Sequence, residues 1–254
     1  MSIKIMSFNL RYDSEHDGIN SFTNRIERVI KVIENEQADI IGFQEVTDSM
    51  RTRIRERLSD KYTLVGCGRD SNYHGEAMLI AFKSDIFEFI SLDNIWLSTT
   101  PNIPGTRYGG DHSSCPRMYT SILLKHDEID KPFRFINTHL DHVGANGRVL
   151  EATQLLNDIC AYQEKFILTG DFNAEPSSPE IRLITDCKSK SITDCTEGLC
   201  PTFHDFGRLP QEKRLKIDYI FTDGACLDSY AIIDTPVNGQ YYSDHYAVCA
   251  LIEL

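Results

Sequence analysis

Three short motifs bring carboxylates, an amide and a histidine to the ends of apolar runs. They are Gly170-Asp171-Phe172-Asn173-Ala174, Ile217-Asp218-Tyr219-Ile220-Phe221 and Ser243-Asp244-His245. In α/β proteins, polar groups that follow a buried strand face the crevice where ligands bind. Oxygen ligands, a histidine and a separate aspartate are suited to hydrolysing a phosphate ester with Mg²⁺. One such motif has many explanations, and it is their combination that indicates this chemistry.

His245 and Asp218 are the candidate pair for proton transfer. A histidine can take a proton from water when a carboxylate orients its other ring nitrogen. Asp218 lies within an apolar strand pattern, where an unpaired carboxylate is costly, so it needs a dedicated partner. A solitary histidine is more often structural, but the nearby acids favour the catalytic interpretation.

Asp171 and Asn173 lie two residues apart, so an extended segment would aim both the same way. An aspartate can orient a nucleophilic water, and an asparagine can donate to a phosphoryl oxygen as charge builds on it. The alternative is an Asx-type turn that closes the strand. That alternative is credible for Asn173 alone and less so for the pair.

Asn9 and Glu45 each follow an apolar run, Met6-Ser7-Phe8 and Ile40-Ile41-Gly42-Phe43. A carboxylate and an amide at strand ends can hold Mg²⁺, which takes one or two carboxylates and keeps several waters. Taken alone, Glu45 fits a surface acid or helix cap, and Asn9 fits a turn residue. Together they predict a mixed amide–carboxylate metal site.

Glu76, His139 and Arg117 complete the set of candidate residues. Glu76 opens the strand pattern of residues 76–83, and His139 closes that of residues 133–139. A second pair of histidine and acid would provide separate groups for the attacking and leaving oxygens. Arg117 could clamp a phosphate through its planar guanidinium, and a surface salt bridge is the alternative.

The elements that must position these residues follow from hydrophobic periodicity. Strand, polar tip, helix, strand and acidic tip occur in this order twice, from residue 3 to Glu45 and from Phe133 to Asp171. Each unit can therefore deliver two polar groups to the same edge of a sheet. Further strands are expected at 62–66, 76–83, 86–97, 118–126, 216–222, 226–233 and 245–253. Residues 98–116 and 187–215 read as irregular, and no linker divides the chain, so we expect one domain over residues 1–254.

Composition excludes several classes of protein. The 254 residues are 41% hydrophobic and 25% charged, as expected for a globular protein with a sizeable core. No apolar run approaches the ~20 residues that span a bilayer, and Met1 is followed at once by a strand pattern that leaves no room for a secretory signal. The eight cysteines include no C-x-x-C pair, which favours reduced thiols in a cytoplasmic protein. A net charge of −12 argues against tight, extended, non-specific DNA binding, although a local basic groove or a bridging cation remains compatible with it.

With these residues assembled, the chain resembles the endonuclease/exonuclease/phosphatase superfamily, whose folds are of the deoxyribonuclease I type. The resemblance runs nearly end to end and depends on eight ordered motifs: Ser7-Phe8-Asn9, Gln44-Glu45, Gly75-Glu76, Pro116-Arg117, Asn137-Thr138-His139-Leu140, Gly170-Asp171-Phe172-Asn173-Ala174, Ile217-Asp218-Tyr219-Ile220 and Ser243-Asp244-His245. It implies an α/β (α+β) fold, a four-layer α/β/β/α sandwich of two packed mixed β-sheets with outer helices and the active site at one edge.

The resemblance also implies a metal site and a catalytic pair. Asn9, Glu45 and Asp244 would hold Mg²⁺, with Mn²⁺ as a substitute. His245 and Asp218 would form the base pair. Which histidine of the site serves as acid and which as base stays open.

The remaining roles that the resemblance implies concern the substrate. Asp171 would help to position water. Asn173 and His139 would contact the scissile phosphate, with Glu76 supporting His139. Arg117 would lie near a phosphate oxygen.

Three segments indicate the subfamily. They resemble those of a group of small bacterial members that is loosely related to the deadenylase and nocturnin-like branch: Ile95–Pro101, Pro104-Gly105 and Thr138–His142. Ile217-Asp218-Tyr219 differs from the Cys-Asp-Arg core of inositol polyphosphate 5-phosphatases. Arg11 stands where apurinic-site endonucleases usually have an acid. Secreted neutral sphingomyelinases have exposed aromatic membrane loops and an export signal, whereas the single tryptophan here, Trp96, lies in a strand pattern.

The leading hypothesis is therefore a Mg²⁺-dependent phosphodiesterase acting on nucleic acid or a nucleotide, such as an exonuclease on single-stranded ends. The alternative enzyme is a phosphatase or phosphodiesterase for a small phosphorylated metabolite or lipid head group. A catalytically dead binding scaffold would have lost a ligand or the base, and none is missing. No membrane association and no protein partner are inferred.

Overall fold

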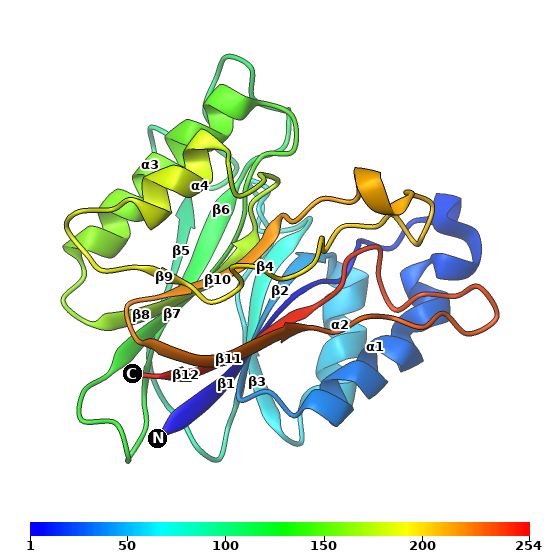
Figure 1. The fold of residues 1–254 in the computed structure, drawn as a ribbon, viewed down its shortest axis with the longest axis horizontal. Helices are drawn as coiled ribbons and strands as arrows, with labels where there is room; N and C mark the ends of the chain where they lie inside the picture. Colours follow the sequence, from blue (N-terminus) through cyan, green and yellow to red (C-terminus); the bar gives the residue numbers. More distant parts are fainter.

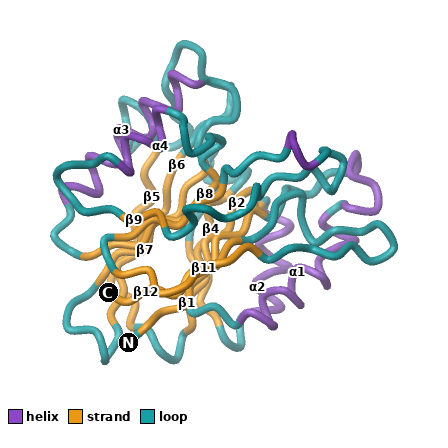
Figure 2. Tube along the Cα trace, in the orientation of Figure 1, coloured by secondary structure: helices purple, strands orange, loops and turns teal.

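Two six-stranded β-sheets pack face to face in the computed structural model, which describes residues 1–254 (Figure 1). Helices α1 and α2 lie outside one sheet and α3 and α4 outside the other, as the expected four-layer sandwich requires (Figure 2). The fold predicted from the resemblance is thus confirmed. The elements in chain order are β1 (Ser2–Asn9), η1 (Glu15–Asn20), α1 (Phe22–Glu36), β2 (Ile40–Val46), α2 (Asp48–Leu58), β3 (Tyr62–Val65), β4 (Ala77–Lys83), β5 (Glu88–Trp96), β6 (Met118–Lys125), β7 (Phe133–His139), α3 (Ala145–Ala161), β8 (Lys165–Asp171), α4 (Pro179–Thr185), β9 (Thr193–Asp194), η2 (Gln211–Lys213), β10 (Asp218–Thr222), β11 (Ala225–Ala231) and β12 (Val248–Glu253).

The repeated strand–helix–strand unit forms the centre of each sheet. The first sheet has the order β11-β12-β1-β2-β4-β3 and the second β5-β6-β7-β8-β10-β9. Strands β1 and β2 are parallel and joined by α1, and β7 and β8 are parallel and joined by α3. Both units therefore end their strands at one edge, as predicted, and the chain termini lie at the other end of β1 and β12 (Figure 1).

Strand register aligns three of the candidate residues in a row. In the parallel pair β7–β8, His139 is opposite Asp171. In the antiparallel pair β8–β10, Asp218 is opposite the same Asp171. A shift of either strand by one residue would turn these side chains to the opposite face, so the apolar core that fixes the register also fixes the row.

Side chains that point alternately to the two faces of a strand explain how the layers pack. In β1, Ile3 and Ile5 face the second sheet, whereas Met6 and Phe8 face the helices. Each of these side chains is 0% exposed, and burying one contributes about 1.5–3 kcal/mol. Helix α1 meets this outer face with its apolar stripe, which includes Val29.

A polar layer joins the two sheets directly beneath the site edge. Asn137 Nδ2 donates to the carbonyl oxygens of Phe43 (2.8 Å) and Leu79 (3.1 Å) in the opposite sheet. Its Oδ1 accepts from Gln44 Nε2 at 2.6 Å. Gly42 is required at this crossing, because a Cβ there would lie 2.7 Å from Asn137 Oδ1.

The structure differs from the sequence-based expectations in local detail. Helix α4 lies in a segment for which no helix was predicted, and β12 begins at Val248 rather than at residue 245. Ser21 precedes α1, and its side chain makes no capping hydrogen bond. The loop 98–116 contains no helix or strand, as predicted.

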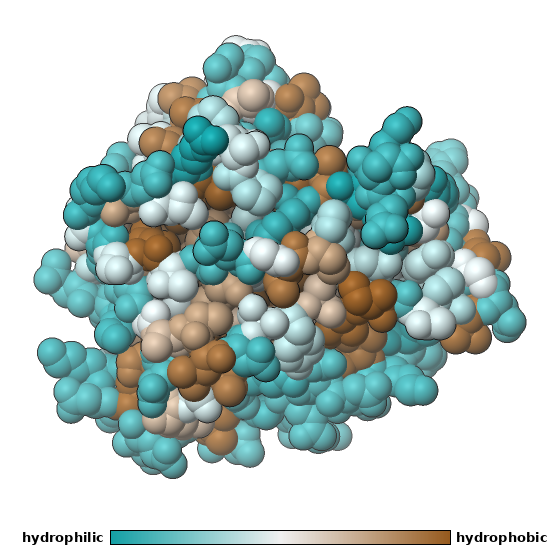
Figure 3. All heavy atoms as spheres, in the orientation of Figure 1, coloured by the Kyte–Doolittle hydropathy of each residue, from teal (hydrophilic) through white to brown (hydrophobic).

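The hydropathy of the surface and of the helices bears on whether the chain spans a membrane. On the face shown in Figure 3, hydrophobic residues occur in scattered groups among hydrophilic ones. None of the helices combines the length and the apolar character that a membrane-spanning segment needs.

Candidate active site

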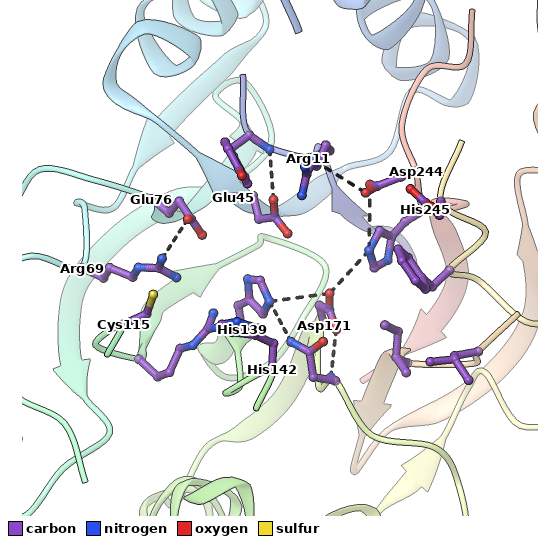
Figure 4. A pocket seen from close by; sticks show the side chains of 17 residues that line it. Arg11, Glu45, Arg69, Glu76, Cys115, His139, His142, Asp171, Asp244 and His245 are labelled. Atoms are coloured by element: carbon purple, nitrogen blue, oxygen red, sulfur yellow. Dashed lines mark hydrogen bonds and ion pairs between the residues drawn. The ribbon is translucent and has the colours of Figure 1, made fainter. Parts of the chain in front are cut away.

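The strand ends of both sheets surround a cleft of about 500 Å³. All ten residues singled out from the sequence lie in its walls or directly behind them. Figure 4 shows His139 and Asp171 in the middle of the cleft, Asp244 and His245 on one side, and Arg69 and Glu76 on the other. The cleft wall includes Glu45, Glu76, Arg117, His139, Asp171, Asn173, Asp244 and His245, whereas Asn9 and Asp218 are buried behind it.

His245 is held by Asp218 and directed at Asp171. Its Nδ1 lies 2.9 Å from Asp218 Oδ2, and its Nε2 lies 3.7 Å from Asp171 Oδ2. Burial alone would lower the pKa of His245, but the negative charge of Asp218, with that of Asp244 and Asp171, raises it to about 10. The imidazole is therefore oriented and strongly basic in the absence of a cation.

Asp171 is a buried carboxylate of the cleft with a strongly raised pKa. It is 2% exposed, and burial followed by repulsion from Asp218 raises its pKa to about 7. Its Oδ2 accepts from Asn9 Nδ2 at 2.9 Å, and its Oδ1 accepts from the backbone N–H of Asn173 at 2.9 Å. This second contact is the Asx-type turn that was the alternative interpretation of Asn173.

Asn173 nevertheless also faces the cleft. Its φ is 48°, so the segment is not extended, and its Nδ2 lies 3.0 Å from His139 Nε2. The same Nδ2 donates to the carbonyl of Leu140 at 3.0 Å. Asn173 thus takes part in the turn and also lies beside His139.

Glu45 reaches the cleft through an irregularity of β2. The pairing of β2 with β4 shifts register between Phe43 and Val46, and Glu45 has a φ of 62°. A bulge of this kind redirects a side chain, and a non-glycine residue in the left-handed region is strained. Four of the eight non-glycine residues with positive φ line the cleft: Arg11, Glu45, Asn173 and Asp205.

The acidic groups of the cleft fit a divalent cation. Ligating atoms of Glu45, His139 and Asp171 all lie within 4.8 Å of one another, and burial raises the pKa of Asp171 and Asp244. Buried carboxylates that resist ionisation are stabilised by a cation among them. Asp244 is in the same cleft, with Oδ2 3.8 Å from Arg11 Nε.

Asn9 does not present an oxygen to this site. Its Nδ2 points at Glu45 Oε1 (3.1 Å) and Asp171, while its Oδ1 accepts from the backbone N–H of Arg11 at 2.9 Å. In this orientation Asn9 positions the carboxylates by donating to them. That Asn9 ligates a metal through its oxygen stays a prediction.

The expected pair of Glu76 with His139 is replaced by a different one. Glu76 Oε1 accepts from Arg69 Nη2 at 2.8 Å. The acid near His139 is instead Asp171, 3.7 Å from Nε2, and His139 Nδ1 is buried without a partner. Burial, followed by repulsion from Arg117 and Arg69, holds the pKa of His139 well below its usual value, so this imidazole is neutral.

Arg117 is a buried wall of the cleft and not a surface residue. It is 3% exposed, and its Nη2 donates to His142 Nδ1 at 2.7 Å. Its Nε lies 3.7 Å from Asp141 Oδ2. Asp141 in turn accepts from the backbone N–H groups of Val143 and Gly144 and from Ser113, so the loop before β6 and the loop before α3 are fixed together.

A buried histidine–glutamate pair anchors the same loop. His112 Nε2 contacts Glu151 Oε1 on α3, and both side chains are 0% exposed. We expect His112→Gln to destabilise the fold by about 3 kcal/mol, because it leaves a buried carboxylate without its cationic partner. Burial lowers the pKa of His112, but Glu151 and Asp141 outweigh it and raise that pKa. The contribution is therefore complete below a pH of about 6.5 and is lost as the pH rises above this value.

Urea unfolding of wild type and His112→Gln between pH 6 and pH 9 measures this difference. We expect the gap in unfolding free energy to shrink as the pH rises. The matched control is His74→Gln, which breaks a histidine–aspartate pair whose histidine side chain is 63% exposed. A gap that widens with pH, or that is equal in the control, would contradict the assignment.

Arg25 joins the loop after β1 to the segment that precedes Asp244. This α1 residue is 0% exposed, and its guanidinium donates to the backbone carbonyls of Asn20 (2.7 Å), Tyr242 (2.7 Å) and Arg11 (2.5 Å). We expect Arg25→Met to cost roughly 3 kcal/mol in unfolding free energy, because two buried carbonyls and one part-buried carbonyl lose their donor. Urea unfolding checks this against Arg55→Met on the exposed face of α2. Equal stability of the two variants would contradict it.

Three groups of the cleft were missed by the sequence analysis. Arg69 precedes a turn and has no distinguishing pattern, and His142 was noted only as part of a longer segment. Arg11 was noted only as a departure from another family. All three line the cleft, and Arg11 and Arg69 are paired with Asp17 and Glu76.

Comparison with known proteins agrees with this geometry. The model of a family described as endonuclease/exonuclease/phosphatase matches residues 6–245. The crystal structure of an endonuclease/exonuclease/phosphatase from Bacteroides vulgatus is 30% identical, with a TM-score of 0.92 over 100% of this chain and 99% of that one. A mannosyl-6-phosphatase from Bacteroides thetaiotaomicron is 25% identical, with a TM-score of 0.88 over 99% and 100%. The human nocturnin catalytic domain, 18% identical with a TM-score of 0.73 over 99% and 94%, shares the fold.

Proposed function

The chain belongs to the endonuclease/exonuclease/phosphatase family and is a phosphoric ester hydrolase, and from this premise we propose that it uses Mg²⁺ to hydrolyse the phosphate ester of a small phosphorylated metabolite. The observation that carries the proposal is the cleft itself. It combines buried carboxylates, two histidines and buried guanidinium groups in about 500 Å³. That volume lies within the range of sites for small molecules.

Charge supports a small substrate over a long nucleic acid. The chain carries a net charge of −12, whereas proteins that hold an extended phosphate backbone usually show a basic face. The cationic groups of the cleft wall are Arg11, Arg69 and Arg117, and each lies beside an acid. The structural neighbour named a mannosyl-6-phosphatase acts on a substrate of this size.

In the proposed reaction, some residues of the cleft bind the attacking water and others bind the phosphate. Asp171 and His245 hold the attacking water, with Asp218 fixing the imidazole so that Nε2 faces Asp171. Asn173 contacts the phosphate through the N–H groups of Nδ2, and His139, whose Nε2 lies 3.0 Å from that nitrogen, lies beside the same phosphate. Glu45, Asp171 and Asp244 would hold a divalent cation, which would supply Lewis-acid stabilisation to the phosphate, and Mn²⁺ has suitable ligand preferences to replace Mg²⁺.

The second candidate is a phosphodiester in a nucleotide or at the end of a single-stranded nucleic acid, the leading hypothesis from the sequence. Two aromatic rings beside the cleft favour it, those of Tyr12 and Phe203. Aromatic side chains of this kind can stack on a base, which contributes about 1–3 kcal/mol per base. We also propose a cytoplasmic location, in keeping with eight free cysteines.

A single assay separates the two candidates. Purified protein is incubated with Mg²⁺ or with EDTA against hexose phosphates, nucleotides, and single-stranded DNA and RNA with free ends. We expect hydrolysis of the small esters, loss of that hydrolysis in EDTA, and slower cleavage of the nucleic acids. Faster cleavage of the nucleic acids would favour the second candidate, and hydrolysis that persists in EDTA would overturn the proposed metal dependence.

A further inference from the structure

We propose that Arg69, Glu76, Arg117 and His142 form a subsite that recognises the hydroxyl groups of the leaving alcohol, so that the preferred substrates are phosphate esters of a sugar or similar polyol. The inference rests on the proposed function and concerns the part of the substrate beyond the phosphate. Glu76 and Arg117 were singled out from the sequence for other roles, whereas Arg69 and His142 were not candidate residues.

Position is the first argument. In an in-line displacement the attacking and leaving oxygens lie on opposite sides of the phosphorus. His245 and Asp218 mark the side of the water. Figure 4 shows Arg69 and Glu76 across the cleft from His245, with His139 between them. The leaving alcohol therefore lies against this wall.

Unmet hydrogen-bonding capacity is the second argument. Arg69 is 8% and Arg117 3% exposed, and both line the cleft. Arg69 Nη1, Arg117 Nε and Arg117 Nη1 are buried donors without a partner. A buried donor left unsatisfied costs about 1–3 kcal/mol. Three such donors on one wall indicate that a ligand rich in oxygen acceptors completes them.

The wall has hydrogen-bond donors beside an acceptor, and this combination determines which kind of ligand fits. Glu76 Oε1 already accepts from Arg69, and its carboxylate has further capacity to accept. An anion could pair with the arginines but would be repelled by Glu76 wherever it approached that carboxylate. A hydroxyl group both donates and accepts, so it can satisfy an arginine and the glutamate together. A polyol matches this wall better than a carboxylate or a second phosphate.

The wall is also held rigidly, as a selective subsite requires. Trp96 Nε1 donates to the carbonyl of Arg69 at 2.6 Å, which fixes the turn that carries it. Arg117 is held by His142 at 2.7 Å and faces Asp141 at 3.7 Å. These contacts come from the end of β5 and from the loop after β7, so the spacing of the two guanidinium groups is set by the fold.

The first experiment compares two phosphate esters on the wild-type protein. A hexose 6-phosphate and cyclohexylmethyl phosphate have rings of the same size and a primary alkoxide leaving group, and they differ in the ring hydroxyls. We expect kcat/KM to be at least about 100-fold higher for the hexose 6-phosphate, which corresponds to about 2.7 kcal/mol. Equal values with both esters would overturn the subsite. No cation-dependent hydrolysis of either ester would instead overturn the proposed function.

The second experiment tests the residues. In Arg69→Gln we expect the preference for the hexose ester to fall about tenfold relative to wild type, whereas in Arg69→Lys, which keeps the charge beside Glu76, it falls less. The matched control is Arg107→Gln, an exposed arginine of the loop 98–116. Thermal unfolding shows whether each variant is folded. An equal loss on both esters in folded Arg69→Gln would mean a general structural role and would overturn the assignment.

Discussion

Replacing His245 by alanine lowers kcat by roughly 10³-fold with little change in the fold, as expected for loss of a positioned proton-transfer group. His245 is the one side chain that joins the buried carboxylate of Asp218, at 2.9 Å from Nδ1, to the water position beside Asp171, at 3.7 Å from Nε2. Steady-state kinetics on the best small phosphate ester measures the effect. The change falls on kcat more than on KM, because the imidazole acts on the water and not on the leaving alcohol.

Two further variants give this prediction its controls. Asp218→Asn keeps the shape but removes the charge that raises the pKa of His245, so kcat falls as well, and the double variant is no slower than His245→Ala alone. His16→Ala removes an exposed histidine outside the cleft and leaves kcat unchanged. Additive losses from Asp218→Asn and His245→Ala would show that the two residues do not act as a unit.

The row of His139, Asp171 and Asp218 shows what could be predicted from sequence. Each residue closes or opens a strongly apolar strand, and the alternation of those strands determines which face the side chain takes. The repeated strand–helix–strand unit made the parallel pairing and the shared edge predictable in the same way. The residues at these positions were therefore identified without knowledge of the structure.

Glu45 and Glu76 show where sequence reasoning fails. The chain around Glu45 reads as a plain strand end, but its side chain reaches the cleft only because a bulge places the residue at a φ of 62°. No local pattern marks that bulge. Glu76 was matched to His139, yet Arg69, which is seven residues away across a turn, takes its carboxylate at 2.8 Å. Such pairings depend on the three-dimensional contacts of neighbouring loops, which strand and helix periodicity does not encode.

Asp171→Asn gives the second large expected effect, because it should reverse the response of stability to Mg²⁺. Burial and repulsion from Asp218 raise the pKa of Asp171 to about 7, above its unfolded value of 3.8. Holding it ionised at pH 8 without a cation therefore costs stability, and this cost is absent below a pH of about 4. In EDTA at pH 8 we expect the variant to be more stable than wild type by about 1 kcal/mol or more, roughly 2–4 °C in Tm.

Adding Mg²⁺ should invert this order. Wild type gains about 2.7 kcal/mol when Mg²⁺ reaches 100 times its dissociation constant, because only the folded protein holds the carboxylates together. Asp171→Asn lacks one of the three candidate ligands whose atoms lie within 4.8 Å of one another. Its Tm therefore changes little when Mg²⁺ is added, and its hydrolytic activity is lost. Thermal unfolding in EDTA and in a Mg²⁺ series measures both curves, with Asp60→Asn on the exposed surface as the control. If the Tm of wild type were independent of Mg²⁺, or if Asp171→Asn were the less stable protein in EDTA, the cleft would not be a cation site of the kind described.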